Sequence, residues 1–254
     1  ESIAEEIRSK GEGPGMSDNV LITGVSSGIG KGLAIEYLAD GGAVWGVSRR
    51  APDHSLREHP NFHFRQLDLA CASQVGPCLN DLLGGCQRLD TVILNAGAIG
   101  RMADMAEISL QEMRQLMDIN VWANKSVLDA LFEKRFPVGR VIGISSGAAV
   151  TGKRGWNGYA ISKAALNMLI QLYAREQPQI WFASVAPGLV ETSMQEYLCN
   201  HPPDARFGSL DDLRSKRGTD QMPTPAMAGA KLKRLFDGIE SRVESGGFID
   251  IRQI

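Results

Sequence analysis

Short apolar runs alternate with longer stretches of helical periodicity along the chain from residue 19 onward. Seven of these runs are expected strands, at 20–22, 43–47, 62–67, 91–94, 140–144, 180–185 and 248–251. Between them lie five expected helices, at 30–38, 75–83, 113–132, 159–173 and 226–238. Strands that alternate with helices form βαβ units, whose right-handed crossovers make the strands parallel and cover both faces of the sheet. The alternation therefore predicts an α/β fold with a doubly wound parallel sheet of about seven strands.

Composition and charge exclude several other classes of protein. The chain has 254 residues, of which 43% are hydrophobic and 22% are charged, as is typical of one large globular domain. Its formal net charge of −2 argues against nucleic-acid binding, and no run of residues is apolar enough for a membrane span. The four cysteines and four histidines show no metal-ligand spacing. We therefore expect no metal site, reduced thiols and a cytoplasmic location.

Two regions depart from the alternating pattern. Residues 1–15 are charged and end in a Gly/Pro run, so we expect an expression remnant or a loose extension ahead of a single domain at 16–254. Residues 199–225 are rich in Pro, Asp, Arg and Gly, which predicts a mobile excursion between the sixth strand and the last helix. We expect the segment at about 193–225 to act as a substrate loop.

A glycine-rich turn joins the first expected strand to the first expected helix, in the order Thr23-Gly24-Val25-Ser26-Ser27-Gly28-Ile29-Gly30. Gly24 allows the tight turn, Gly28 lets the backbone approach a pyrophosphate, and Gly30 lets the helix pack closely on the sheet. The N–H groups that begin the helix, with the Ser26 and Ser27 hydroxyls, can then donate to an anion. The strand–turn–helix context predicts a dinucleotide site of Rossmann type.

Two arginines follow the second strand. An NAD site usually has an acid at this point, which binds the ribose 2′-hydroxyl. Here the strand ends in Ser48-Arg49-Arg50, and no acid follows until Asp53. Because a guanidinium pairs well with a phosphate, Arg49 and Arg50 favour NADP(H) as the cofactor. The alternative is a solvated basic turn without a ligand.

Residues after the third and fourth strands extend the expected cofactor site. Asp68, followed by Leu69, could accept a hydrogen bond from an adenine amino group, although an aspartate at a strand end is also an ordinary helix cap. Asn95-Ala96-Gly97 follows the next strand. The small residues of this motif let the backbone approach a cofactor, and Asn95 can tie neighbouring strands together.

Three polar residues predict acid–base chemistry. Tyr159 and Lys163 are four positions apart in an expected helix, so their side chains share one face. A free phenol has a pKa of about 10, and a nearby ammonium would lower the pKa of Tyr159. Ser146 precedes Tyr159 by thirteen residues, just past the fifth strand, and its hydroxyl could orient a carbonyl oxygen beside the phenol.

The chain resembles the short-chain dehydrogenase/reductase family in its compact single-domain branch. The matching motifs are Thr23-Gly24-x-x-x-Gly28-x-Gly30, Asn95-Ala96-Gly97, Asn120, Ser145-Ser146, Tyr159-x-x-x-Lys163 and Pro187-Gly188. The resemblance implies that Tyr159 donates a proton, that Ser146 anchors the carbonyl, and that Lys163 holds the nicotinamide ribose. Of the two serines, Ser146 keeps the family spacing to Tyr159.

The resemblance implies further roles. Asn120 would support a water-linked proton path to Lys163. After Pro187-Gly188, the Val190 backbone and the Thr192 hydroxyl would meet the nicotinamide amide. The family also implies a homodimer or homotetramer, paired through the apolar helices expected at 110–132 and 159–173.

A narrower resemblance is to sepiapterin reductases and benzil reductases. Gly155-Trp156-x-x-Tyr159 and the ending Ser245-Gly246-Gly247-Phe248-Ile249-Asp250 carry it. Sepiapterin reductases have an acid near the C-terminus that holds the pterin, but Gln253 stands at the aligned position here. The resemblance thus implies NADPH-dependent reduction of a ketone or an α-dicarbonyl. Pterins rank second because of Gln253, and charged acyl carriers rank third because no basic patch is evident near residues 199–225.

The expected substrate pocket is mostly apolar. Ser146 and Tyr159 are its convergent polar groups, Trp156 and Met194 are expected walls, and Tyr197 and Leu198 would add apolar surface. No acid or arginine is expected to point into this pocket, which favours a neutral aromatic or hydrophobic carbonyl.

Two other readings stay open. One is a catalytically silent, NADP-binding regulatory protein on the same scaffold, because a fold does not fix a function. The other is a dehalogenase or epimerase without net redox chemistry. The presence of Asn120, Ser146, Tyr159 and Lys163 argues against the silent protein, and the intact glycine turn and Lys163 argue against the dehalogenase or epimerase.

Overall fold

The structure, a computed structural model, describes residues 18–254, so the expectation for residues 1–15 lies outside the described residues. Seven strands form one parallel sheet in the order β3-β2-β1-β4-β5-β6-β7. Their bounds are β1 Asn19–Thr23, β2 Ala43–Ser48, β3 Phe62–Gln66, β4 Leu89–Leu94, β5 Val138–Ile144, β6 Trp181–Ala186 and β7 Gly247–Asp250. The predicted doubly wound parallel sheet is confirmed.

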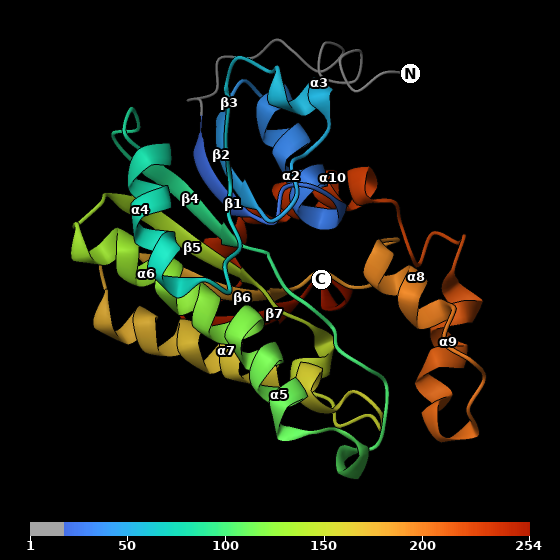
Figure 1. Cartoon of the computed structure of the whole chain (residues 1–254). Coiled ribbons are helices and arrows are strands. Elements are labelled where there is room, and N and C mark those ends of the chain that lie inside the picture. Colours follow the sequence, from blue (N-terminus) through green and yellow to red (C-terminus); the bar gives the residue numbers. More distant parts are fainter. Residues whose placement is uncertain (1–17) are drawn as a thin grey trace.

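Helices cover both faces of the sheet (Figure 1). One face carries α2 (Gly28–Ala39) and α10 (Pro225–Phe236), and the short α3 (His54–Arg57) precedes β3. The other face carries α4 (Ala72–Leu82), α5 (Leu110–Met117), α6 (Ala123–Glu133) and α7 (Asn157–Glu176). Within residues 18–254, none of the helices combines the length and apolar composition needed to cross a membrane.

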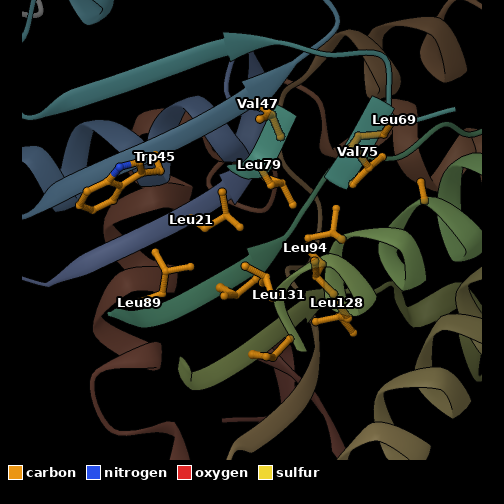
Figure 2. Packing of buried hydrophobic residues seen from close by; sticks show 14 of the residues in the cluster. Leu21, Trp45, Val47, Leu69, Val75, Leu79, Leu89, Leu94, Leu128 and Leu131 are labelled. Carbon is orange, nitrogen blue, oxygen red and sulfur yellow. The ribbon is translucent and has the colours of Figure 1, made fainter. Parts of the chain in front are cut away.

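The strands are buried on both faces because successive side chains enter two different cores. Leu21 of β1 packs with α4 and α6, where Figure 2 shows it among Leu79, Leu94 and Leu131. Its neighbour Ile22 packs instead with residues of α2 and α10. Double burial explains why the strands appear in the sequence as continuous apolar runs rather than as alternating ones.

The helix predicted at 113–132 is divided in the structure. A π-helical turn at Asp118–Trp122 separates α5 from α6. Asn120 lies in this turn, where its backbone oxygen accepts a hydrogen bond from Asn124 Nδ2 at 2.8 Å. Its side chain bonds to Ala98, in the loop after β4, and to Ser162 of α7. The turn therefore aims Asn120 at two neighbouring segments, as π-turns near functional sites often do.

The expected substrate loop at 193–225 contains two helices, and the second of them lies within residues 199–225, where the composition predicts a mobile excursion. α8 (Ser193–Cys199) and α9 (Gly208–Lys216) lie beside the main body of the molecule (Figure 1). They enclose a third apolar cluster, made of Met102, Leu198, Phe207, Leu210, Leu213 and Met222. Arg206, between the two helices, pairs with Asp104 and Glu107. The segment is thus joined to the loop after β4 by apolar packing and by ion pairs.

Two glycines let α2 and α10 approach closely. A Cβ on Gly32 of α2 would lie 2.1 Å from the Pro225 carbonyl oxygen, and a Cβ on Gly229 of α10 would lie 2.5 Å from the Gly32 carbonyl carbon. Both contacts are with backbone atoms, which cannot rotate away as a side chain can. The position of α10 on the sheet therefore depends on both glycines.

Replacing Gly229 by alanine should lower the free energy of unfolding by about 1–3 kcal/mol, because the added methyl group forces the two backbones apart. Urea denaturation followed by circular dichroism measures the change. Gly208→Ala is the matched control, since Gly208 has helical backbone angles and no atom near the position of a Cβ. The control should be neutral or stabilise by up to about 1 kcal/mol. Equal losses in both variants would contradict the packing argument.

Candidate active site

A cavity of about 480 Å³ lies at the carboxyl ends of the strands, where open α/β sheets bind their ligands. Most of the predicted site residues line it: Gly24, Ser26, Ser27, Gly28, Ile29, Arg49, Arg50, Asp68, Leu69, Asn95, Ala96, Gly97, Ser146, Trp156, Tyr159, Lys163, Pro187, Gly188, Val190, Thr192 and Met194. Two predicted site residues, Gly30 and Asn120, lie outside the lining. The structure thus brings together motifs that are spread over most of the sequence.

The glycine turn forms one wall of this cavity. Gly24 and Gly28 have φ angles of +80° and +60°, in the left-handed region that favours glycine. The N-cap of α2, Ser27, makes no side-chain capping bond, and no acid stands in the first turn. Backbone N–H groups there remain able to donate to an anion. Gly30 does not line the cavity, but it lets α2 pack closely against the turn, since a Cβ on it would lie 2.3 Å from the Gly24 carbonyl oxygen.

Asn95 fixes this turn to the neighbouring strand. Its Nδ2 donates to the Thr23 carbonyl oxygen at 2.9 Å, and its backbone N–H donates to Thr23 Oγ1 at 2.9 Å. The side chain thus ties β1 to β4, as the sequence predicts. Asp68 also lines the cavity, but its Oδ1 accepts from the Ala70 N–H at 3.0 Å, so it stabilises its own turn.

Arg49 and Arg50 place positive charge at the end of β2. Their backbones are held, because Ser48 Oγ donates to the Arg50 carbonyl oxygen and Gln66 Nε2 donates to that of Arg49. Across residues 18–254, neither guanidinium forms an ion pair. Asp53, the nearest following acid, pairs with Lys31 Nζ at 2.5 Å and does not line the cavity.

Tyr159 and Ser146 form the polar centre of the cavity. Tyr159 is buried, and its hydroxyl lies close to that of Ser146. Burial raises the pKa of the Tyr159 phenol, and the neighbouring Ser146 hydroxyl offsets only part of that effect. Lys163 Nζ lies 6.0 Å from the centre of the Tyr159 ring and donates to the Ile144 carbonyl oxygen at 2.8 Å. Burial is the largest influence on the pKa of the Tyr159 phenol, so the net lowering expected from Lys163 is not found in this structure.

The two adjacent serines are separated by their partners. Ser145 Oγ donates to Asn167 Oδ1 of α7 at 2.6 Å, which holds β5 against that helix. Ser146 Oγ accepts from the Ala148 N–H at 3.1 Å and meets Tyr159. This geometry supports the choice of Ser146 as the serine that faces a ligand.

Asn120 lies behind the cavity rather than in its wall. Its Oδ1 accepts from the Ala98 N–H and its Nδ2 donates to the Ala98 oxygen, both at 2.8 Å. A second bond from Nδ2 reaches Ser162 Oγ at 2.9 Å. These bonds hold the loop after β4 against α7 at Ser162, which directly precedes Lys163 and lies about one turn after Tyr159. The expected proton path through Asn120 stays a prediction.

The loop after β6 closes the cavity opposite the glycine turn. A Cβ on Gly28 would lie 3.2 Å from the Thr192 methyl carbon, so the two loops nearly touch. Thr192 is the N-cap of α8, and its Oγ1 accepts from the Gln195 N–H at 3.4 Å. Its hydroxyl proton is still available to a ligand. Val190 is buried and also lines the cavity.

Trp156 lies beside the Tyr159 phenol and also lines the cavity. Its ring centre lies 5.9 Å from that of Tyr159, and its Nε1 donates to Ser209 Oγ of α9 at 2.9 Å. Met194 lines the cavity as predicted. Tyr197 and Leu198 do not, because Tyr197 is exposed and Leu198 belongs to the third apolar cluster.

Charged residues also line this side, which the sequence analysis missed. They are Lys153, Asp212, Lys216 and Arg252. The expectation that no acid or arginine points into the pocket is therefore wrong. The expectation that no basic patch lies near residues 199–225, on which the third rank of charged acyl carriers depends, is wrong as well. Arg252, not Gln253, is the residue of the last segment that reaches the cavity. Its position after β7 was the available signal, since the carboxyl ends of parallel strands meet at one edge.

The pH dependence of stability tests the burial of Lys163. Burial lowers the pKa of the Lys163 ammonium to about 8, whereas an unfolded lysine titrates at about 10.4. Between these values the unfolded chain binds more protons than the folded chain, so the contribution of this group to stability rises with pH.

The free energy of unfolding of the wild type, relative to Lys163→Met, should rise by about 2 kcal/mol from about pH 7 to about pH 10. Urea denaturation across this range measures the difference. Lys134→Met, at an exposed lysine, is the control and should show no such trend. A difference that stays flat or falls with pH would show that the ammonium is not held in a desolvated site.

Comparison with known sequences gives a consistent family. The profile of the family described as short chain dehydrogenase matches residues 18–202. An uncharacterised oxidoreductase of Saccharomyces cerevisiae is 33% identical over 241 residues, covering 89% of this chain and 94% of the relative. Benzil reductase ((S)-benzoin forming) of Bacillus subtilis is 29% identical over 245 residues, covering 92% of this chain and 98% of the relative.

Solved structures agree with this result. A short chain dehydrogenase/reductase from Saccharomyces cerevisiae superposes with a TM-score of 0.83 at 28% identity, covering 92% of this chain and 96% of the other. A protein described as a short chain dehydrogenase from Shigella flexneri, complexed with NADP, has a TM-score of 0.74 at 25% identity, covering 92% and 97%. With the family profile spanning most of the chain, this protein is an oxidoreductase that belongs to the short-chain dehydrogenase/reductase family.

Proposed function

We propose that this oxidoreductase uses NADPH to reduce a carbonyl group, in a ketone or an α-dicarbonyl, to an alcohol, with Tyr159 as the proton donor. The observation that carries the proposal is the shared cavity. The neighbouring Ser146 and Tyr159 hydroxyls line the same cavity as the glycine turn and Arg49. The similarity to a benzil reductase supports a carbonyl substrate, since benzil is an aromatic α-diketone.

The residues present fit a phosphorylated dinucleotide. Gly24 and Gly28 adopt the backbone conformation of a tight phosphate-binding turn, and α2 begins without an acid or a side-chain cap. Arg49 follows β2 and lines the cavity, without an ion-pair partner in residues 18–254, and can bind an adenosine 2′-phosphate. When bound, the reduced nicotinamide supplies a hydride to the carbonyl carbon.

The protein's own groups then manage the proton. Because burial raises the pKa of Tyr159, its phenol is protonated at neutral pH, as a proton donor must be. Ser146 donates to the carbonyl oxygen and orients it beside Tyr159. As negative charge develops on that oxygen, the Tyr159 proton moves to it, and the nearby Lys163 ammonium stabilises the phenolate that remains.

Tyr159→Phe should lower kcat for carbonyl reduction by about 10²–10⁴-fold, because it removes the proton donor and keeps the ring. NADPH affinity should change little. Stopped-flow or steady-state oxidation of NADPH with benzil measures the rate, and quenching of protein fluorescence measures binding. Tyr197→Phe is the control, since Tyr197 is exposed and outside the cavity. A Tyr159→Phe enzyme with normal turnover would refute the assignment of this residue.

Arg49→Asp should weaken NADPH binding about ten- to a hundredfold more than NADH binding, because it removes a charge-assisted bond to the 2′-phosphate. Titration of both cofactors into wild type and variant measures the ratio. Arg57→Asp, at an exposed arginine of α3 outside the cavity, makes the same change of charge and should leave the ratio unaltered. A wild-type preference for NADH would overturn the assignment of the phosphate site.

The alternative functions receive less support from the geometry. A silent NADP-binding protein does not need a serine and a buried tyrosine side by side in the cavity. A pterin reductase needs an acid at the end of the chain, but Gln253 is exposed and Asp250 is paired with Arg252. A homodimer or homotetramer stays part of the proposal, supported by the exposed apolar residues Ile161, Met168 and Leu172 along one side of α7.

A further inference from the structure

Arg252 crosses the carboxyl ends of three strands. It follows β7, and its aliphatic part covers Gly188 after β6, where a Cβ would lie 3.5 Å from Arg252 Cγ. Its guanidinium reaches Gly147 after β5, where a Cβ would lie 2.5 Å from Arg252 Nη2. Because Gly147 follows Ser146 directly, the arginine head group lies beside the serine that faces the carbonyl.

Asp250 holds this guanidinium in place. Arg252 Nε donates to Asp250 Oδ1 at 2.9 Å and Nη2 donates to Oδ2 at 2.5 Å, so the pair is bidentate. The Asp250 side chain is only 6% exposed, while that of Arg252 is 56% exposed. Within the described residues, Arg252 Nη1 has no hydrogen-bond partner. One edge of the guanidinium is thus fixed, and the other can donate to a ligand in the cavity.

The surroundings favour an electron-rich partner. Lys153 and Lys216 line the same side of the cavity, where Lys216 pairs with Asp212 at 2.7 Å. The cations are Lys153, Lys216 and Arg252, and the carboxylates beside them are Asp212 and Asp250, so the region has a net positive charge. An oxygen acceptor that carries partial or full negative charge is stabilised in such a field.

We propose that Arg252 is a specificity-determining residue that binds a second oxygen, carried on the carbon next to the reacting carbonyl. Two substrate classes present such an oxygen. In 1,2-diketones it is a neutral carbonyl, and in α-keto acids it belongs to a carboxylate. This inference rests on the proposed carbonyl reduction and deepens it, since it assigns the substrate class to a residue outside the Ser146–Tyr159–Lys163 group.

The test compares matched substrates in the full-length enzyme. Benzil and deoxybenzoin have the same two phenyl rings and differ only in the second carbonyl oxygen, and benzoylformate carries a carboxylate in place of the second benzoyl group. The ratio of kcat/KM for benzil to that for deoxybenzoin should fall about ten- to a hundredfold in Arg252→Leu, the effect of losing a charge-assisted bond. The greater intrinsic reactivity of benzil is the same in both enzymes and cancels in this comparison. Benzoylformate should lose as much as benzil or more.

Two further variants separate this effect from misfolding and from general charge. Arg252→Leu leaves the buried Asp250 carboxylate without its partner, which can destabilise the fold. The double variant Asp250→Asn/Arg252→Leu removes this unpaired charge and should show the same fall in the benzil to deoxybenzoin ratio. Arg242→Leu removes an exposed arginine outside the cavity and should leave the ratio unaltered. An unchanged ratio of kcat/KM for benzil to that for deoxybenzoin in both Arg252 variants would overturn the proposal. A loss of NADPH affinity as large as the loss of kcat/KM for benzil would also overturn it, because it would place Arg252 at the cofactor.

Calorimetric titration with benzil and deoxybenzoin supplies a readout that does not need turnover. If the wild type oxidises no NADPH with any of these ketones, the proposed function fails. The inference on Arg252 would survive that result only if the wild type still binds benzil more tightly than deoxybenzoin and the Arg252 variants lose the preference. Equal binding of the two ketones by the wild type would overturn it.

Discussion

The side chain of Asn95 joins β1 and β4 at the point where the strand order of the sheet reverses. From β1 the chain builds outward to β2 and β3, and it then returns to place β4 on the other side of β1. The loops that leave these two strands diverge and leave a crevice between them. By bonding to Thr23, Asn95 sets the separation of the two loops and the path of the turn at Gly24. A cavity with a defined shape follows from that constraint.

Helix α7 organises the other half of the cavity. Residues one turn apart on it face the same space, so Trp156, Tyr159 and Lys163 follow one another along the wall. Each lies against a different neighbour: Ser209 of α9 for Trp156, Ser146 for Tyr159, and the end of β5 for Lys163. The helix is held in turn by Asn120, through Ser162. The residues to which the proposed function assigns substrate contact, proton donation and cofactor contact therefore lie along one helix.

The sequence predicted the sheet and most of the cavity lining because both depend on local signals. Strands buried on two faces appear as apolar runs, and the glycine turn and Tyr159-x-x-x-Lys163 are contiguous motifs. Other features depend on contacts between distant residues. The apolar periodicity continues from α5 through the π-turn at Asn120 into α6, so the sequence pattern does not reveal the π-turn. The helices α8 and α9 depend on a cluster completed by Met102, far away in the sequence. The pKa of Tyr159 and the reach of Arg252 follow from burial and strand order, which no short motif encodes.

The segment that carries α8 and α9 has an apolar cluster separate from the two cores of the sheet. Substitutions in this cluster alter the wall around Trp156 and Met194, while the packing of the strands keeps its own support. Selection can therefore change the substrate wall here at small risk to folding, without a change in the glycine turn or in the α7 residues. An enzyme built in this way can acquire new substrates while it keeps the same reaction chemistry.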